Sequence, residues 1–123
     1  MRQGKARAVP SRNPEWTEDE MILGLAVYRR IGIGSLSKTR REVLELSELL
    51  NLLPIHPPQY RATSFRNPQG VTRRLNIFRE LESGRFRKGY AKYKRLLEKF
   101  GADTGAIQNA ASEVLAKYGH IGA

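Results

Sequence analysis

The sequence has no cysteine, few histidines and no long apolar run. Without cysteine the chain has no disulfide, no thiolate metal site and no thiol nucleophile. Its two histidines, His56 and His120, stand 64 positions apart and leave little for an imidazole site. No segment approaches the roughly 18 consecutive apolar residues of a transmembrane helix, and the N-terminus lacks the apolar core of a secretory signal. We therefore expect a soluble, cytoplasmic protein that uses neither a metal nor a cofactor.

The length and the composition are those of one ordinary globular domain. Two full domains would need roughly 200 residues or more, and the chain has 123. Hydrophobic residues make up 40% of the chain and charged residues 28%, which is enough apolar material for a core. Wholesale disorder is not expected.

Acidic residues are scarce in the middle of the chain. Overall, 22 Lys and Arg against 12 Asp and Glu give a net charge of +10. Residues 49–97 hold eleven basic and two acidic residues, a net +9, and the rest of the chain is nearly neutral at +1. A concentrated basic region is typical of proteins that bind a polyanion, and nucleic acid is the commonest. A solvated basic surface without a partner is the alternative interpretation.

Helix-start and helix-stop signals predict an all-α fold. A side chain suited to capping a helix precedes four of the segments, at Thr17, Thr39, Asn67 and Asp103. The apolar periodicity predicts five helices, over residues 17–30, 39–53, 68–82, 88–100 and 104–118. No segment shows sustained strand alternation, which leaves room for at most a small hairpin in one loop.

The predicted organisation is a compact five-helix domain with two appendages. Residues 1–13 form a flexible basic arm, residues 14–119 the helical domain, and residues 120–123 a tail. Between the second and third helices, residues 54–66 contain three prolines and form an ordered, irregular loop. The middle of the first helix, residues 21–28, is apolar or glycine on all sides, which predicts the buried centre of the domain.

Catalytic motifs are missing. The chain has no phosphate-binding Walker loop, no dinucleotide-binding glycine motif and no zinc-protease helix. In the basic middle the only carboxylates are Glu80 and Glu82, which point in different directions on a helix and do not form a magnesium site. We interpret the acids of the first two helices as cap and surface charges, and the proline-flanked His56 as a turn residue. The chain is therefore expected to bind rather than to catalyse.

The start of the third predicted helix gathers side chains suited to DNA. A helix N-terminus attracts phosphate through its free N–H groups and its dipole, and Arg, Asn and Gln can make paired hydrogen bonds with base edges. The candidates are Arg66, Asn67, Gln69, Gly70 and Arg73. Alternatively, Asn67, Pro68 and Gly70 only build a tight joint between loop and helix.

Residues 85–95 interleave further cations with aromatic side chains. Stacking of the aromatics on bases is conceivable, but the helical spacing favours an inward position for Tyr93. The cations of this run are then non-specific phosphate contacts. They are Arg85, Arg87, Lys88 and Lys92.

Three blocks of the sequence resemble a known family. They are RNPEWTEDEMILGLAVY (residues 12–28), LSELLNLLPIHP (46–57) and SFRNPQGVTRRLNIF (64–78). In order and spacing they are similar to the sulfur-binding domain of HNH-type, type IV restriction endonucleases, which recognises phosphorothioate-modified DNA. The resemblance covers residues 11–80, and the last 40 residues add little to it.

The resemblance implies a set of site residues. In the family, an arginine before an Asn-Pro pair lies beside a cup of proline, alanine and tyrosine groups that accepts the sulfur. Two departures from the family pattern are Ser11, where a histidine is common, and the Arg73-Arg74 pair, which replaces a pair ending in lysine. The resemblance matches Arg12 to that arginine and Arg66 and Asn67 to residues near the bases, and for the sulfur pocket the loop offers Pro57, Pro58, Tyr60 and Ala62. Further predicted DNA-binding residues are Asn13, Arg61, Ser64, Arg73 and Arg74.

We therefore expect residues 14–119 to form a DNA-recognition domain that reads phosphorothioate-modified duplex DNA without cutting it. An HNH nuclease cannot lie in this chain because the two histidines are too far apart and cysteine is absent. A nuclease domain or subunit is thus an expected partner. The alternatives are a reader of methylated or unmodified DNA, a basic protein-interaction module and, weakest, a metal-dependent nuclease.

Overall fold

A helix buried on every side forms the centre of the domain. In the computed structural model, which describes residues 10–119, α1 (Glu18–Ile31) buries each of its residues from Glu20 to Tyr28. Thr17 caps this helix as predicted: its hydroxyl accepts the Glu20 N–H, and the Glu20 carboxylate accepts the Thr17 N–H. The apolar middle of the first predicted helix is therefore confirmed as the core.

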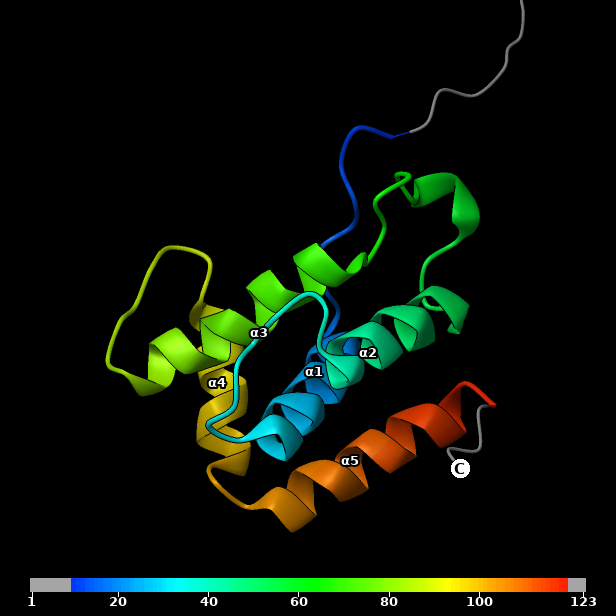
Figure 1. The fold of residues 1–123 in the computed structure, drawn as a ribbon. Coiled ribbons are helices and arrows are strands. Elements are labelled where there is room, and N and C mark those ends of the chain that lie inside the picture. Colours follow the sequence, from blue (N-terminus) through cyan, green and yellow to red (C-terminus); the bar gives the residue numbers. More distant parts are fainter. Residues whose placement is uncertain (1–9, 120–123) are drawn as a thin grey trace, which may run out of the picture.

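The other helices surround α1, and each of them contacts it. They are α2 (Arg41–Leu52), α3 (Pro68–Glu82), α4 (Ala91–Phe100) and α5 (Thr104–Lys117), with a short 3-10 helix, η1, at Pro58–Tyr60. In Figure 1, α3 and α5 lie on either side of α1. The fold is an all-α single domain, and no strand forms between residues 10 and 119, so no loop there holds a hairpin.

Residues 1–9 and 120–123 lie outside the described part of the chain, and with them most of the predicted arm and the predicted tail.

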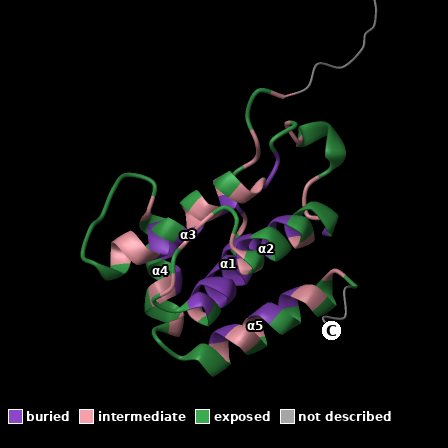
Figure 2. Cartoon of the chain, in the orientation of Figure 1, coloured by how far each residue is buried: buried purple, intermediate pink, exposed green. Residues whose placement is uncertain are grey.

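The inward stripes of the helices follow the predicted periodicity. Figure 2 shows the buried residues concentrated on α1 and on the faces of the other helices that turn toward it. On α2 and the residue after it, the predicted stripe is buried throughout, and so is that of α3. These residues are Val43, Leu46, Leu50, Leu53, Val71, Leu75 and Phe78. Burial of such side chains stabilises the fold by about 1.5–3 kcal/mol each.

Two predicted helix starts are wrong. The second helix was expected to begin at Thr39, but α2 begins at Arg41 with Arg40 as its N-cap and no side-chain cap. The Thr39 backbone N–H and hydroxyl are engaged with the Ser37 hydroxyl instead. The fourth helix was expected from Lys88, but α4 begins at Ala91 because Gly89, at φ +94°, breaks the helical path.

Across residues 10–119 no helix combines the length and the apolar character needed to cross a bilayer.

Candidate nucleic-acid interface

A buried ion pair lies beneath the predicted DNA-binding residues. The Arg66 guanidinium donates to both carboxylate oxygens of Glu20, at 2.7 Å from Nε to Oε2 and 3.0 Å from Nη2 to Oε1. The Glu20 side chain is 0% exposed and that of Arg66 3%. Burial alone would raise the pKa of Glu20, but hydrogen bonds from Arg66, Thr17 and His56 outweigh it and hold the pKa below its ordinary value.

Arg66 joins three segments of the chain. Its guanidinium also donates to the carbonyls of Pro14 and Glu15, at 2.9 and 3.3 Å, and so holds the segment that precedes α1. Its backbone is in the left-handed region at φ +47°, which costs on the order of 1–3 kcal/mol for a residue with a side chain. The Ser47 hydroxyl on α2 donates to the Arg66 carbonyl at 2.7 Å. The prediction that Arg66 reads a base edge is not consistent with this buried position.

Arg61 also has its side chain directed into the protein. Its guanidinium donates to the carbonyls of Asn51, Leu53 and His56, at 2.8–3.1 Å, and lies over the ring of Phe65 at 4.4 Å. These carbonyls belong to the end of α2 and the following loop, which have no helical partners of their own. Arg61 therefore organises the loop instead of offering its charge to DNA.

The segment before α1 is attached to this loop by one side chain. The Asn13 carboxamide accepts the Ala62 N–H at 2.8 Å and donates to the Ser64 hydroxyl at 3.2 Å. The attachment places Arg12, which is exposed, beside α3 and the loop. Asn13 and Ser64, both predicted to bind DNA, therefore form a hydrogen bond with each other.

A basic groove of about 720 Å³ runs along α3. It is lined by the segment 12–16 and by α3, with Arg73 and Arg74 among its cations and Glu15 and Glu80 as its carboxylates. Arg73 is exposed, whereas Arg74 is half-buried and donates to the Tyr93 hydroxyl at 3.3 Å. Eight of the ten predicted DNA-binding residues line this groove: the buried Arg66 and seven others, namely Arg12, Asn13, Ser64, Asn67, Gly70, Arg73 and Arg74.

The start of α3 has the predicted cap. The Asn67 side chain accepts the Gly70 N–H at 2.8 Å, and Pro68 occupies the first turn. Asn67 and Gly70 both line the groove, while Gln69 is exposed and does not. The joint between loop and helix and the wall of the groove are therefore built by the same residues.

A second, smaller hollow of about 370 Å³ adjoins the groove and shares Arg12, Asn13 and Pro14 with it. Its apolar lining comes from Pro10, Pro14 and the exposed Tyr60, and His56 completes it. The Nε2 atom of His56 is 2.9 Å from Glu20 Oε1. Arg12 lines both the groove and this hollow.

The hollow differs from the predicted sulfur pocket in its residues. Of the four predicted lining residues, the structure brings only Tyr60 to it. Pro57 and Pro58 are exposed on the outside of the loop, and Ala62 is engaged with Asn13. Pro10 and Pro14 take their place because the Asn13 bridge folds the N-terminal segment against the loop.

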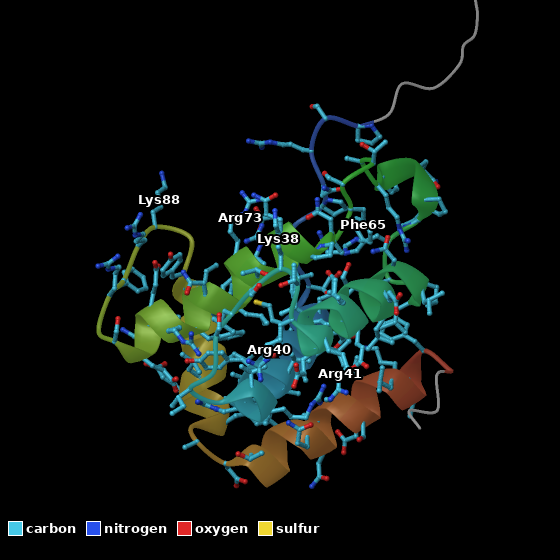
Figure 3. The ribbon with its side chains drawn as sticks, viewed as in Figure 1. Lys38, Arg40, Arg41, Phe65, Arg73 and Lys88 are labelled. Carbon is cyan, nitrogen blue, oxygen red and sulfur yellow. The ribbon has the colours of Figure 1, made fainter. Side chains whose placement is uncertain are left out.

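The four predicted non-specific phosphate contacts are solvent-exposed. Arg85, Arg87 and Lys88 lie in the loop between α3 and α4, and Lys92 lies in the first turn of α4. In Figure 3, Lys88 and Arg73 project from the same edge of the molecule. Tyr93 is buried against Phe78, as its spacing predicts, and burial raises the pKa of its hydroxyl despite the nearby Arg74.

Two site residues were missed at the level of the sequence. Glu20 was interpreted as a cap charge, and it does cap α1. Its carboxylate also forms hydrogen bonds with Arg66 and His56 of the distant loop. His56 was interpreted as a turn residue, although its imidazole contacts the buried pair. Among residues 10–119, no three acidic or histidine side chains gather as metal ligands would.

Comparison with known proteins leaves the chain without a match: no family model, no curated protein and no solved structure is significantly similar to it.

Proposed function

We propose that this chain is a DNA-binding recognition module that reads phosphorothioate-modified duplex DNA. The observation that carries the proposal is the position of Arg12, an exposed residue that lines both the basic groove and the apolar hollow. A phosphate bound by Arg12 would lie where the groove and the hollow meet, and one of its non-bridging positions would then face the apolar lining.

The apolar lining of the hollow favours sulfur over oxygen. Replacing a non-bridging oxygen by sulfur keeps the negative charge but makes the atom larger and a poorer hydrogen-bond acceptor. An oxygen set against Pro10, Pro14 and Tyr60 would lose hydration without compensation, whereas sulfur has less hydration to lose. The hollow therefore supplies discrimination, and the groove supplies affinity for any phosphate backbone.

The groove supports contact with duplex DNA next to the modified phosphate. Arg73 and Asn76, both exposed, lie on the groove side of α3. Arginine and asparagine can each pair with a purine edge in the major groove. The same residues would serve a reader of methylated or unmodified DNA, which is the second candidate function.

The proposal assigns this chain recognition and no catalysis. Strand cleavage, where it accompanies recognition, would belong to an HNH nuclease domain or subunit. The partner of the described surface is double-stranded DNA.

Gel shifts with matched duplexes, one carrying the sulfur and one not, test the proposal. We expect the wild-type chain to bind the modified duplex more tightly, and Arg12→Ala to lose most of this preference. Arg41→Ala is a matched control, because Arg41 is an exposed cation at the start of α2 that does not line the groove.

Three other results would point elsewhere. Equal binding of both duplexes would rule out sulfur recognition and leave a reader of unmodified DNA. Preference for a methylated duplex would support the second candidate. Binding that hardly depends on salt, or none at about 100 mM salt, would support a basic module that docks an acidic protein.

A further inference from the structure

The outer face of α4 carries a row of three cations, of which the predicted phosphate contacts include only Lys92. Lys92, Arg95 and Lys99 are spaced by three and four residues, which places them on one face of the helix. All three are exposed. They border a hollow of about 420 Å³ between α4 and the first turn of α1.

The cations of this row are free to meet a partner. Within residues 10–119, neither Arg95 nor Lys99 takes part in a salt bridge, and Lys92 lies 3.7 Å from Glu15. Both members of that pair are strongly exposed, 58% for Lys92 and 89% for Glu15, so the pair is weak and easily exchanged. Glu18 is the acidic residue that lines the hollow.

The row is continuous with the basic groove. Trp16 lines both hollows, and Glu15, which Lys92 contacts, lines the groove along α3. Through its contact with Glu15, Lys92 is the cation that connects the row to the groove.

We propose that Lys92, Arg95 and Lys99 form a second contact with the phosphate backbone of the same DNA duplex, outside the stretch that carries the modification. This inference rests on the proposed function. The row from Lys92 to Lys99 is about 10 Å long at 1.5 Å per helical residue, which corresponds to about three base-pair steps measured along the DNA helix axis at 3.4 Å each.

The lining of the hollow favours DNA over an acidic peptide. A peptide helix would need apolar surface to anchor it, but Trp16, Met21 and Leu96 at the base of the hollow are only 3–6% exposed. What the surface offers is charge. A phosphate backbone requires only charge, and the contact would lengthen the site without adding sequence information.

The test compares two double variants of the full chain that remove equal charge. Arg95→Gln with Lys99→Gln alters the row, and Arg30→Gln with Arg41→Gln alters exposed cations on α1 and α2. The ligands are a sulfur-modified and a plain duplex, each extending a full turn, about 10 base pairs, beyond the modified step on both sides. Affinity is measured over a series of salt concentrations.

We expect the row variant to lower the slope of log affinity against log salt by about 1.8, since each lost phosphate contact removes about 0.9. It should weaken both duplexes by the same factor and leave their ratio unchanged. The control variant should keep the wild-type slope. A hydroxyl-radical footprint of the wild-type complex should extend to one side of the modified step and shorten in the row variant.

The outcomes separate this inference from the proposed function. An unchanged slope and footprint, with the wild-type chain still preferring the modified duplex, would overturn the second contact alone. Equal losses in both double variants would overturn it in favour of general electrostatic attraction. If the wild-type chain binds no duplex, both proposals fail, and selective loss of poly-glutamate binding in the row variant would then indicate an acidic protein partner.

Discussion

Glu20 and Arg66 form an ion pair closed to solvent, although 46 residues separate them in the chain. The pair connects the first turn of α1 to the end of the proline-rich loop, directly below the proposed DNA site.

Removing one member of the pair should destabilise the fold strongly. Glu20→Ala leaves a buried guanidinium without its carboxylate, which costs about 3–5 kcal/mol in the free energy of unfolding. Glu18→Ala, two positions earlier on the exposed side of the same turn, should change it by no more than about 0.5 kcal/mol. Urea titration measures both, and similar losses in the two variants would contradict the buried role of Glu20.

The pair should also make stability depend on pH in acid. The pKa of Glu20 in the folded chain lies below its ordinary value of 4.5, so the carboxylate stabilises the fold above that pH. That stability is lost as the pH falls through the lower, folded-state pKa. Glu82 contributes in the same direction, since its bonds from Arg29 and Tyr28 lower its pKa against the effect of burial.

Unfolding measured from pH 7 downward tests this. Glu20→Gln should show a weaker loss of stability on acidification than the wild-type chain, and adding Glu82→Gln should weaken that loss further. An identical pH profile for wild type and Glu20→Gln would show that the Glu20 carboxylate does not titrate across this range.

Arg12→Ala should weaken DNA binding without changing the stability of the fold. Arg12 is exposed, so we expect unchanged thermal unfolding together with a loss of about 1–3 kcal/mol in binding to modified DNA. Fluorescence anisotropy with a labelled duplex measures the binding. Affinity equal to wild type would exclude Arg12 from the interface, whatever the behaviour of the other groove cations.

Asn67 combines a cap with a place in the groove, and two substitutions distinguish these roles. Asn67→Ala should lower stability by about 1 kcal/mol, because the Gly70 N–H loses its acceptor. Asn67→Asp keeps the acceptor and should fold normally, but its added negative charge in the groove should weaken DNA binding. Normal DNA affinity in the Asp variant would place the duplex away from the start of α3.

Gly24 is required for close packing at the centre of α1. A Cβ atom at this position would lie 3.2 Å from the ring of Trp16 and 3.5 Å from Leu75. Gly24→Val should therefore destabilise the domain by about 1–3 kcal/mol through overpacking. Gly105→Ala is the control: its Cβ has room at 3.5 Å from Asp103, so calorimetry should show a melting temperature equal to or above that of wild type.

Local signals predicted most of the fold. The caps at Thr17, Asn67 and Asp103 formed as expected because each needs only the three following residues. Thr39 does not cap α2, because its backbone N–H donates to the Ser37 hydroxyl two residues earlier. Such competition between turns and caps is decided by small energies, so helix starts are predicted less well than helix interiors.

The candidate site was less accessible to prediction because its contacts are distant in the chain. Arginines that look alike in the sequence have different surroundings: Arg12 and Arg73 are exposed, whereas Arg66 is buried on Glu20. The apolar hollow could not be assigned from the loop alone, since Pro10 and Pro14 reach it only through the bridge that Asn13 makes to Ala62.

The three hydrogen bonds from Arg61 to backbone carbonyls affect the entropy of ligand binding. By fastening the loop to the end of α2, Arg61 removes the conformational freedom of that segment when the chain folds. A ligand that arrives at Tyr60 then meets a wall that is already ordered, and association does not carry the entropy cost of arranging it. The loop is therefore preorganised and should have the same conformation before and after binding.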